Sequence, residues 1–500
     1  MMKTNMRYCR GGILALLCSL LCTCGRAPEN EKRPAEVGAD PRPNVILIID
    51  DQHRYDALGK VNPQVLTPTL DSLAASGIHF TQAVCQAPMC VPSRNSVMFG
   101  LYPSQTGVFR NSDGVPDTAL PGKTMAQYFS DAGYETAGFG KTHWGKHRTG
   151  TRGFETRYSS EIPEDGGITM AMADSAAKAR YDAEIGPMGP GEENNIGYLG
   201  FTSALPEEDH RDGWINQQAL RYLREREDDR PLFFYLSYMK PHAGHNPPAG
   251  YEDLYHTDSI RYAVQPPWDL DYSPHASGVN RRELYEGFWK TATPEQWRLM
   301  TMRYYANVTW IDDMLGRVLS EMKRGGLLDN AIVVYTSDHG EMLGERYYRF
   351  NKYCLYDASV RVPLIVTGSA VANGVGTEDA RPVDLVDVLP TLLQAAGITP
   401  DAALPGVNLL APAAREGSFS ALHEREGEAA FMWRTAEEKL ILVLRRKDQA
   451  RAYGPEDIIT GEFYDLAADP REWNDLYGRA GVAQQQQKFT QAILEKLSGM

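Results

Sequence analysis

The sequence predicts an α/β fold in which a large sheet lies between helices, with a smaller α+β subdomain at the C-terminus. Two observations indicate this fold. Apolar runs rich in β-branched residues, typical of strands buried on both faces, alternate with segments of helical periodicity. Beyond about residue 405 the pattern changes to short strand-like runs and a final amphipathic stretch. A chain of 500 residues is long enough for one large domain and a smaller one.

The elements of the main domain follow in a regular order. Strands are expected where the sequence reads PNVILIID, ETAGFG, PLFFYLSY and NAIVVYTS, at 43–50, 135–140, 231–238 and 330–337. A helix is predicted over 67–77, with Thr67 as N-cap, Pro68 in the first turn and Gly77 as its end. A second helix, ending at Gly325, is predicted from apolar residues at helical spacing, namely Val308, Ile311, Leu315, Val318 and Met322.

Residues 156–215 interrupt this order with glycine, proline and acidic clusters, and we expect inserted loops there. In the C-terminal part, EKLILVLRR at 438–446 and GEFYDL at 461–466 predict strands. The resulting organisation is a main domain over 43–404 and a C-terminal subdomain over 405–500.

The first 24 residues are typical of an export signal. A positive segment with Lys3, Arg7 and Arg10 precedes GGILALLCSLLCTC, an apolar run too short to span a membrane. The end of this run resembles a bacterial lipobox, in which Cys24 is the residue that receives the lipid. The alternative is ordinary signal-peptidase cleavage nearby, but the polar, proline-rich tether over 25–42 favours a lipoprotein. We expect an exported bacterial lipoprotein of the periplasm or outer membrane, held to the membrane by its lipid alone.

Charge and cysteine count narrow the classes of function. The formal net charge of −14 argues against a nucleic-acid partner, because phosphate binding needs basic patches. Without the signal and the lipidated residue, three of the seven cysteines remain: Cys85, Cys90 and Cys354. An odd number argues against a disulfide framework. Cys90, placed just before a Pro-Ser-Arg turn that opens a helix, has no structural explanation.

Polar residues follow four of the predicted strands. Ligands of open α/β sheets bind beyond the carboxyl ends of the strands, where such residues meet. These residues are Asp50 and Asp51, Lys141 and His143, Lys240 and His242, and Asp338 and His339. A single pair is more often a helix cap than a catalytic pair. Four pairs at the same topological position indicate a functional site.

The charges of these residues divide into two groups. Asp50, Asp51 and Asp338 would repel one another without a cation, and an oxygen-dominated set predicts calcium, or less favourably magnesium, with His339 as a less usual ligand. Zinc is disfavoured, since no HExxH-type spacing is present. The other group suits an anionic substrate and proton transfer to a leaving oxygen. Its members are Lys141, His143, His242 and Lys352, although each lysine alone is typical of a solvated surface charge.

Several motifs resemble those of the type I, formylglycine-dependent sulfatases of the alkaline phosphatase superfamily. In chain order they are ILIIDDQ, CVPSR, GKTHWG, KPH, SDHGEMLGE, NKYCLYDASVRVPLI and EFYDLAADPREWNDL. The resemblance runs from about residue 43 to 476 and weakens over 156–290. It implies an alkaline-phosphatase-like mixed sheet sandwiched by helices, and a sulfuric ester hydrolase.

The resemblance also gives Cys90 a role. A maturation enzyme would oxidise it to formylglycine, whose hydrate attacks sulfur with one hydroxyl and expels sulfate with the other. The helix that begins there would point free amides at the substrate anion. The resemblance further implies a bound calcium ion, whose ligands would be Asp50, Asp51, Asp338, His339 and the modified Cys90. Some members of the family carry asparagine where this chain has His339.

Five more residues take roles by the same resemblance. Arg94 and Lys141 would steady the diol and the sulfate, and His143 would take the proton that lets sulfate leave. His242 and Lys352 would protonate or polarise the departing alcohol. We therefore expect a sulfatase acting on a sulfated carbohydrate, with Arg346 and Arg349 as either contacts to a second anionic group or solvated surface residues.

Two alternatives remain open at this stage. A phosphonate monoester or phosphodiester hydrolase would use the same scaffold and signature, and its substrates carry the same single negative charge as sulfate monoesters. A glycan-binding lipoprotein with an inactive sulfatase fold is the other alternative. The intact set of predicted active-site residues argues against inactivity.

Overall fold

The computed structural model describes residues 40–145, 151–160, 166–185, 196–266, 287–371, 374–412, 415–423, 427–446 and 453–500. The predicted signal, Cys24 and the tether up to residue 39 lie outside the described residues. The chain from Pro41 to Met500 forms one compact unit. Among the described helices, none combines the length and the apolar character needed to cross a bilayer.

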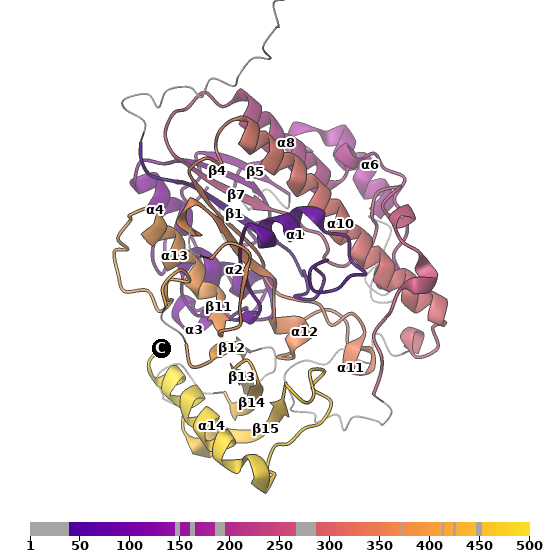
Figure 1. Ribbon diagram of the computed structural model, residues 1–500, viewed down its shortest axis with the longest axis vertical. Coiled ribbons are helices and arrows are strands. Elements are labelled where there is room, and N and C mark those ends of the chain that lie inside the picture. Colours follow the sequence, from indigo (N-terminus) through magenta and orange to yellow (C-terminus); the bar gives the residue numbers. More distant parts are fainter. Residues whose placement is uncertain are drawn as a thin grey trace, which may run out of the picture. The chain divides into compact units, whose positions relative to one another are not determined.

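A nine-stranded mixed sheet forms the centre of this unit, with the strand order β10-β2-β9-β8-β1-β7-β4-β5-β6. Figure 1 labels its strands β1, β4, β5 and β7. Its strands are β1 (Asn44–Asp50), β2 (Gly77–Phe80), β4 (Glu135–Gly140), β5 (Thr156–Ser159), β6 (Ile168–Thr169), β7 (Leu232–Ser237), β8 (Ala331–Ser337), β9 (Leu364–Gly368) and β10 (Thr377–Asp379). Strand β9 runs antiparallel to both neighbours, and the other pairs are parallel. The large mixed sheet is the predicted fold, and all four predicted strands are confirmed.

The register of the central strands fixes where the site lies. Asp50, the last residue of β1, pairs with Ser337 of β8, and Gly140 at the end of β4 pairs with Ser237 of β7. The four parallel strands therefore end at the same edge. Gly140 allows this close pairing, since a Cβ there would lie 1.7 Å from the carbonyl oxygen of Ser237 and the φ angle is +91°.

Helices cover both faces of the sheet, because alternate residues of each strand point to opposite sides. On β1, Ile46 and Ile48 pack with α1 (Pro68–Ala75), α8 (Arg211–Glu225) and α10 (Pro294–Arg324). Val45, Leu47 and Ile49 pack on the other face with α2 (Cys90–Phe99), α4 (Met125–Asp131) and α13 (Val388–Ala395). The remaining described α-helices are α3 (Pro103–Thr106), α5 (Met170–Ala173), α6 (Ser175–Ile185), α7 (Ile196–Leu199), α11 (Glu345–Tyr348), α12 (Asp357–Val360) and α14 (Ala483–Ser498).

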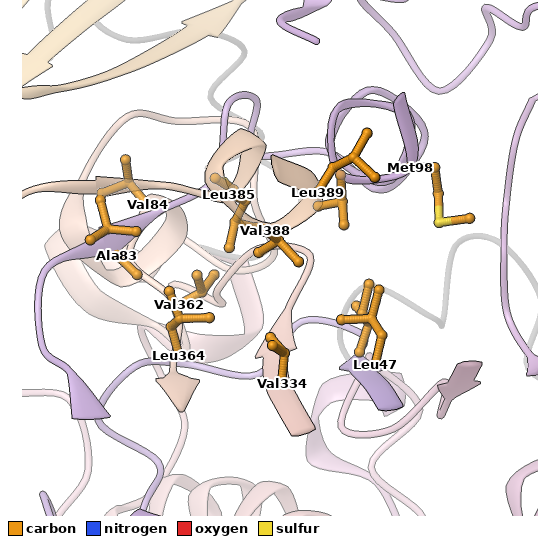
Figure 2. Packing of buried hydrophobic residues seen from close by; sticks show 14 of the residues in the cluster. Leu47, Ala83, Val84, Met98, Val334, Val362, Leu364, Leu385, Val388 and Leu389 are labelled. Carbon is orange, nitrogen blue, oxygen red and sulfur yellow. The ribbon is translucent and has the colours of Figure 1, made fainter. Parts of the chain in front are cut away.

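The second of these faces forms the larger apolar core. Figure 2 shows Leu47 of β1 and Val334 of β8 below Met98 of α2 and Leu389 of α13. All four side chains are at most 1% exposed. Helix α2, which begins at Cys90, is therefore anchored through its C-terminal half to the sheet core.

The helix predicted over 67–77 is present but its ends differ from the prediction. Thr67 occupies the N-cap position without capping the helix through its hydroxyl. The carboxylate of Asp312, from α10, instead accepts the amides of Thr69 and Leu70 at 2.9 and 2.8 Å. The helix ends at Ala75, and Gly77 begins β2, where a Cβ would lie 2.3 Å from the carbonyl oxygen of Val366. A tertiary contact replaced the local cap.

Residues 156–215 are more regular than the loops we predicted, so this prediction is wrong for much of the segment. The described part contains β5 and β6, which extend the central sheet, and α5, α6, α7 and the start of α8. The elements are short, and glycine and acidic residues between them weaken the periodic signal. The helix predicted around Val308 is confirmed and spans Pro294–Arg324, with Gly325 as its C-cap.

The predicted C-terminal subdomain is an antiparallel sheet covered by α14 (Figure 1). Its strands are β12 (Ser418–Leu422), β13 (Glu428–Arg434), β14 (Glu438–Arg445) and β15 (Ile458–Asp465). Two short strands, β3 (Ala83–Val84) and β11 (Val383–Asp384), pair beside β12. Tyr102 and Val386 of the main domain share an apolar core with this sheet.

Candidate active site

The ends of β1 and β8 and the start of α2 bring four predicted metal ligands together. Ligand atoms of Asp51, Cys90, Asp338 and His339 all lie within 4.8 Å of one another, and all four residues are buried. His339 Nδ1 lies 3.0 Å from the carbonyl oxygen of Gly340, so Nδ1 carries the hydrogen and donates it. Nε2 therefore faces the group, 3.3 Å from Cys90 Sγ and 3.6 Å from Asp338 Oδ1.

Asp50, the fifth predicted ligand, lies beside this group rather than within it. Its Oδ2 accepts a short hydrogen bond from the Tyr335 hydroxyl and lies 3.2 Å from His53 Nδ1. Its Oδ1 is buried and has no hydrogen-bond partner among the described residues. Burial raises the pKa of Asp50, against the opposing effect of His53. One carboxylate oxygen is thus held by the protein and the other is available to a ligand.

Arg94 binds both carboxylates of the group, those of Asp51 and Asp338. Its Nε donates to Asp338 Oδ2 at 2.7 Å, and its Nη2 lies 3.3 Å from Asp51 Oδ2. Nη1 donates to the hydroxyls of Ser237 and Tyr235 on β7, at 2.9 and 3.3 Å. With 1% of its surface exposed, Arg94 is a fixed part of the site.

Lys141 forms an ion pair with Asp51, with 2.7 Å between Nζ and Oδ2. Burial alone would raise the pKa of Asp51, but the charges of Lys141, Arg94 and Lys352 hold that pKa well below its ordinary value. Asp51 is therefore ionised. Burial raises the pKa of Asp338 despite the charge of Arg94, and the charge of Asp51 adds to that rise.

Lys352 and His242 complete the surroundings of Cys90. Lys352 Nζ lies 3.2 Å from Cys90 Sγ and 3.0 Å from His242 Nε2. Burial and then the charge of Lys352 lower the pKa of His242 to about 3, so its imidazole is neutral and accepts from the ammonium. Burial and Asp51 would raise the pKa of the Cys90 thiol, but nearby cations, Lys141 and Lys352 foremost, hold it well below its usual value.

The backbone at the start of α2 differs from the expectation of free amides. Met89 is the N-cap residue, and Cys90 is the first residue of the helix. The amide of Val91 donates to Asn111 Oδ1 at 3.0 Å, and the amide of Ser93 donates to the carbonyl of Met89. These two amides are therefore already bonded within the protein.

His143, the remaining predicted residue, follows Lys141 by two positions and is half-buried. Its backbone has a φ angle of +48°, in the left-handed region that non-glycine residues seldom adopt. Strained backbone of this kind is often found at functional sites. The role of His143 stays a prediction.

Some residues of the site were missed by sequence reasoning. Tyr235 and Ser237 hold Arg94, Asn111 binds the start of α2, and Gln52 Oε1 accepts from Lys352 Nζ at 2.9 Å. Tyr235 and Ser237 are polar residues two apart in a strand otherwise apolar, which is a usable signal. Nothing local in the sequence distinguishes Asn111.

Arg346 and Arg349, considered as contacts to substrate or as surface residues, are both buried. The Arg346 guanidinium carbon lies 3.7 Å from the ring centre of Tyr356, and Nη2 donates to the hydroxyl of Tyr464 at 3.3 Å. Arg349 lies 5.2 Å from the ring centre of Tyr356. Arg346 therefore connects its loop to strand β15 of the C-terminal sheet. The alternative that Arg346 and Arg349 are solvated surface residues is wrong, because both are buried.

A metal cation fits the group formed by Asp51, Cys90, Asp338 and His339. Two buried carboxylates and the imidazole lone pair converge, and the unpartnered Oδ1 of Asp50 lies on the neighbouring residue. The carboxylate oxygens are donors of the kind that calcium or magnesium takes.

Comparison with known proteins agrees with this fold. A sulfatase family model matches residues 43–398, and a model of the C-terminal region of N-sulphoglucosamine sulphohydrolase matches 344–498. An ulvan-active sulfatase from Formosa agariphila is 28% identical and covers 91% of this chain and 81% of its own length.

Two solved structures show the same fold at lower identity. The phosphonate monoester hydrolase of Agrobacterium radiobacter has a TM-score of 0.70 and 21% identity, covering 91% of this chain and 95% of its own. A protein solved with its substrate D-glucosamine-2-N,6-O-disulfate has a TM-score of 0.67 and 22% identity, covering 91% and 97%. The chain therefore belongs to the sulfatase family and is a sulfuric ester hydrolase with an alkaline-phosphatase-like fold.

Proposed function

We propose that this sulfatase removes sulfate from a carbohydrate, using formylglycine made from Cys90 and a bound calcium ion. The observation that carries the proposal is the position of the Cys90 sulfur. It lies at the start of a helix, 3.2 Å from Lys352 Nζ and 3.3 Å from His339 Nε2, inside a group that fits a metal. A residue so placed is in contact with the proposed metal site and with Lys352, a cationic side chain that would bind the sulfate anion.

The residues around Cys90 suit the two halves of sulfate transfer. Lys141 and Lys352 provide buried positive charge for the sulfate oxygens, and Arg94 fixes the carboxylates that would hold the cation. Bound by Asp50, Asp51, Asp338, His339 and modified Cys90, calcium would supply Lewis acidity toward a sulfate oxygen. Lys352, hydrogen-bonded to His242, is placed to deliver a proton to the departing alcohol, and His143 is assigned the proton that lets sulfate leave.

The modification has a direct test. Formylglycine at Cys90 makes the peptide that contains it about 18 Da lighter than the gene predicts. It requires a maturation enzyme in the host, so activity should rise with the converted fraction across preparations. Activity that instead follows the unmodified thiol would exclude formylglycine as the nucleophile.

The carbohydrate substrate rests on the relatives, one named for ulvan and one solved with a disulfated glucosamine. Paired assays with sulfated saccharides and with phosphodiesters of matched leaving group test it. We expect kcat/KM for the best sulfated saccharide to exceed that for any phosphodiester. The reverse order would make the chain a phosphodiester or phosphonate monoester hydrolase on a sulfatase scaffold.

Export and lipid anchoring at Cys24 complete the proposal, and they rest on the N-terminal sequence alone. The mature N-terminal peptide should carry a diacylglyceryl group on Cys24 and fractionate with membranes. With Cys24→Ala the protein should lose this mass and leave the membrane fraction while keeping its activity. A wild-type protein found entirely in the soluble fraction would contradict the anchor.

A further inference from the structure

A buried hydrogen-bond chain leads from Glu341 to Lys352. The Nε2 of Gln52 donates a short hydrogen bond to Glu341 Oε2, and its Oε1 accepts from Lys352 Nζ at 2.9 Å. Gln52 and Glu341 are both fully buried. Neither touches Cys90 in the contacts above, whereas Lys352 touches both Cys90 and His242. The chain therefore ends on the ammonium that faces the reacting group.

The chemistry of the two ends fixes the direction of the Gln52 amide. The Lys352 ammonium can only donate, so it requires the amide oxygen. The Glu341 carboxylate can only accept, so it requires the amide nitrogen. Both requirements agree on one orientation, which could not be reversed without setting donor against donor and acceptor against acceptor.

Glu341 also fastens the loop that carries Lys352. Its Oε1 accepts the amides of Leu343, at 2.9 Å, and of Asn351, the residue before Lys352. The backbone of this loop is strained, with φ angles of +48° at Leu343, +69° at Asn351 and +73° at Tyr353. Conformations of this kind persist only where the surroundings hold them. The Glu341 carboxylate thus binds both ends of the loop, and it also binds the Gln52 side-chain amide that accepts from Lys352.

We propose that Glu341 and Gln52 are positioning residues that set the Lys352 ammonium against Cys90 and His242. This inference deepens the proposed function and rests on it for the role of Lys352. It assigns the pair no contact with substrate. Their effect is exerted through the direction of hydrogen bonds, so it depends on donor and acceptor identity rather than on side-chain size.

Exchanging the two side-chain types tests this dependence. Glu341→Gln sets a donor against the Gln52 nitrogen, and Gln52→Glu sets two carboxylates together. Each single variant should lose about 10- to 100-fold in kcat on a sugar sulfate. In the double variant, Gln at 341 donates to Glu at 52, whose other oxygen accepts from Lys352, with the same total charge. The double variant should recover most of the activity.

The substrate pattern separates positioning from general damage. The loss in each single variant should be larger on a sugar sulfate than on nitrophenyl sulfate, because a phenolate leaves without much protonation. In a Lys352→Met background, neither substitution should change that ratio further. Glu462→Gln is a matched control, since Glu462 is a buried carboxylate of β15 that accepts from Tyr464 of the same strand and from Tyr356 of the main domain. It should change the melting temperature without changing the ratio.

A second readout does not require turnover. Labelling of Lys352 by a small amine-reactive reagent, measured by mass spectrometry, should be several-fold faster in the single variants and return toward wild type in the double variant. Gln52→Met, which removes the amide and keeps the volume, replaces Glu341→Gln if that variant does not fold.

These readouts also separate two kinds of failure. A wild-type protein without sulfatase activity overturns the proposed function, and the labelling pattern still tests the positioning pair. Folded single variants with wild-type kcat, ratio and labelling overturn the positioning role. A folded double variant no better than the worse single variant overturns it as well.

Discussion

Two buried clusters of charged side chains differ in how many of their carboxylate oxygens have a hydrogen-bond or ion-pair partner. The active-site cluster surrounds Cys90. The second, which we call the subdomain cluster, lies where α12 meets the C-terminal sheet and consists of Asp357, Arg434, Lys439 and Glu472. Arg434 donates to both oxygens of Asp357 at 2.8 and 2.7 Å, and Lys439 Nζ lies 2.6 Å from each of Asp357 Oδ1 and Glu472 Oε1. The fourth carboxylate oxygen accepts the amide of Asp357 at 2.8 Å.

The subdomain cluster therefore has two acids, two bases and no carboxylate oxygen without a partner. In the active-site cluster, by contrast, carboxylate oxygens from Asp51 and Asp338 converge with a thiol and an imidazole lone pair, and Asp50 Oδ1 has no partner among the described residues. Burial of charge alone does not mark a functional site, because a balanced set can serve structure. A functional site is instead marked by buried carboxylates that converge and need a further cation to balance their charge.

The largest expected effect is that of Cys90→Ala. Removing the proposed nucleophile should lower kcat at least about 10⁴-fold, since catalytic groups that act as a unit fail together. The melting temperature should stay close to that of the wild type, because Cys90 lies at a helix end. Cys354→Ala, which removes another buried thiol, is the control and should keep its activity. Turnover by folded Cys90→Ala would remove Cys90 from the mechanism.

Metal removal should have the second-largest effect, and it should act on the active-site cluster alone. A strong chelator should lower activity about 10³-fold, since Lewis acidity contributes several kcal/mol, and should lower the melting temperature because the carboxylates then repel. Added calcium should restore both quantities, and Asp51→Asn should reproduce the loss. Full activity in protein shown by elemental analysis to hold no metal would refute the metal site.

Arg434→Met should have the opposite profile. It leaves the buried Asp357 short of its main partner, which we expect to cost about 3 to 5 kcal/mol of unfolding free energy. Activity per folded molecule should not change. Arg324→Met is a matched control on a surface pair with Glu321, whose loss should cost far less because solvent screens an exposed ion pair. If Arg434→Met lowered kcat in folded protein, the subdomain cluster would not be purely structural.

His242→Ala should give the smallest and most selective change. We expect kcat on a sugar sulfate to fall about 10²-fold, with little change on nitrophenyl sulfate, whose leaving group needs little protonation. His79→Ala, at a buried histidine of β2, should affect both substrates alike. Equal losses on both substrates for His242→Ala would leave His242 a role in binding sulfate only.

Sequence reasoning succeeded where a residue's position follows from the strand before it. Asp51, Lys141, His242 and Asp338 each follow a strong apolar run, and parallel strands bring such ends to one edge. The motif around Cys90 added the proposed nucleophile through resemblance, and that role stays a prediction. The same reasoning failed over 156–215, where β5, β6, α5 and α7 have only two to four residues and the longer helix α6 is barely amphipathic, so little periodicity can be detected.

The sequence by itself determined four strands of the central sheet, the long helix around Val308 and the identity of the residues at the strand ends, because periodicity and chain order are local properties. Only the tertiary structure decided which partners those residues meet. Asp312 caps a helix 243 residues away, and Gln52 orients a lysine 300 residues away. Such contacts depend on packing between distant elements, for which neither side chain carries a local signal.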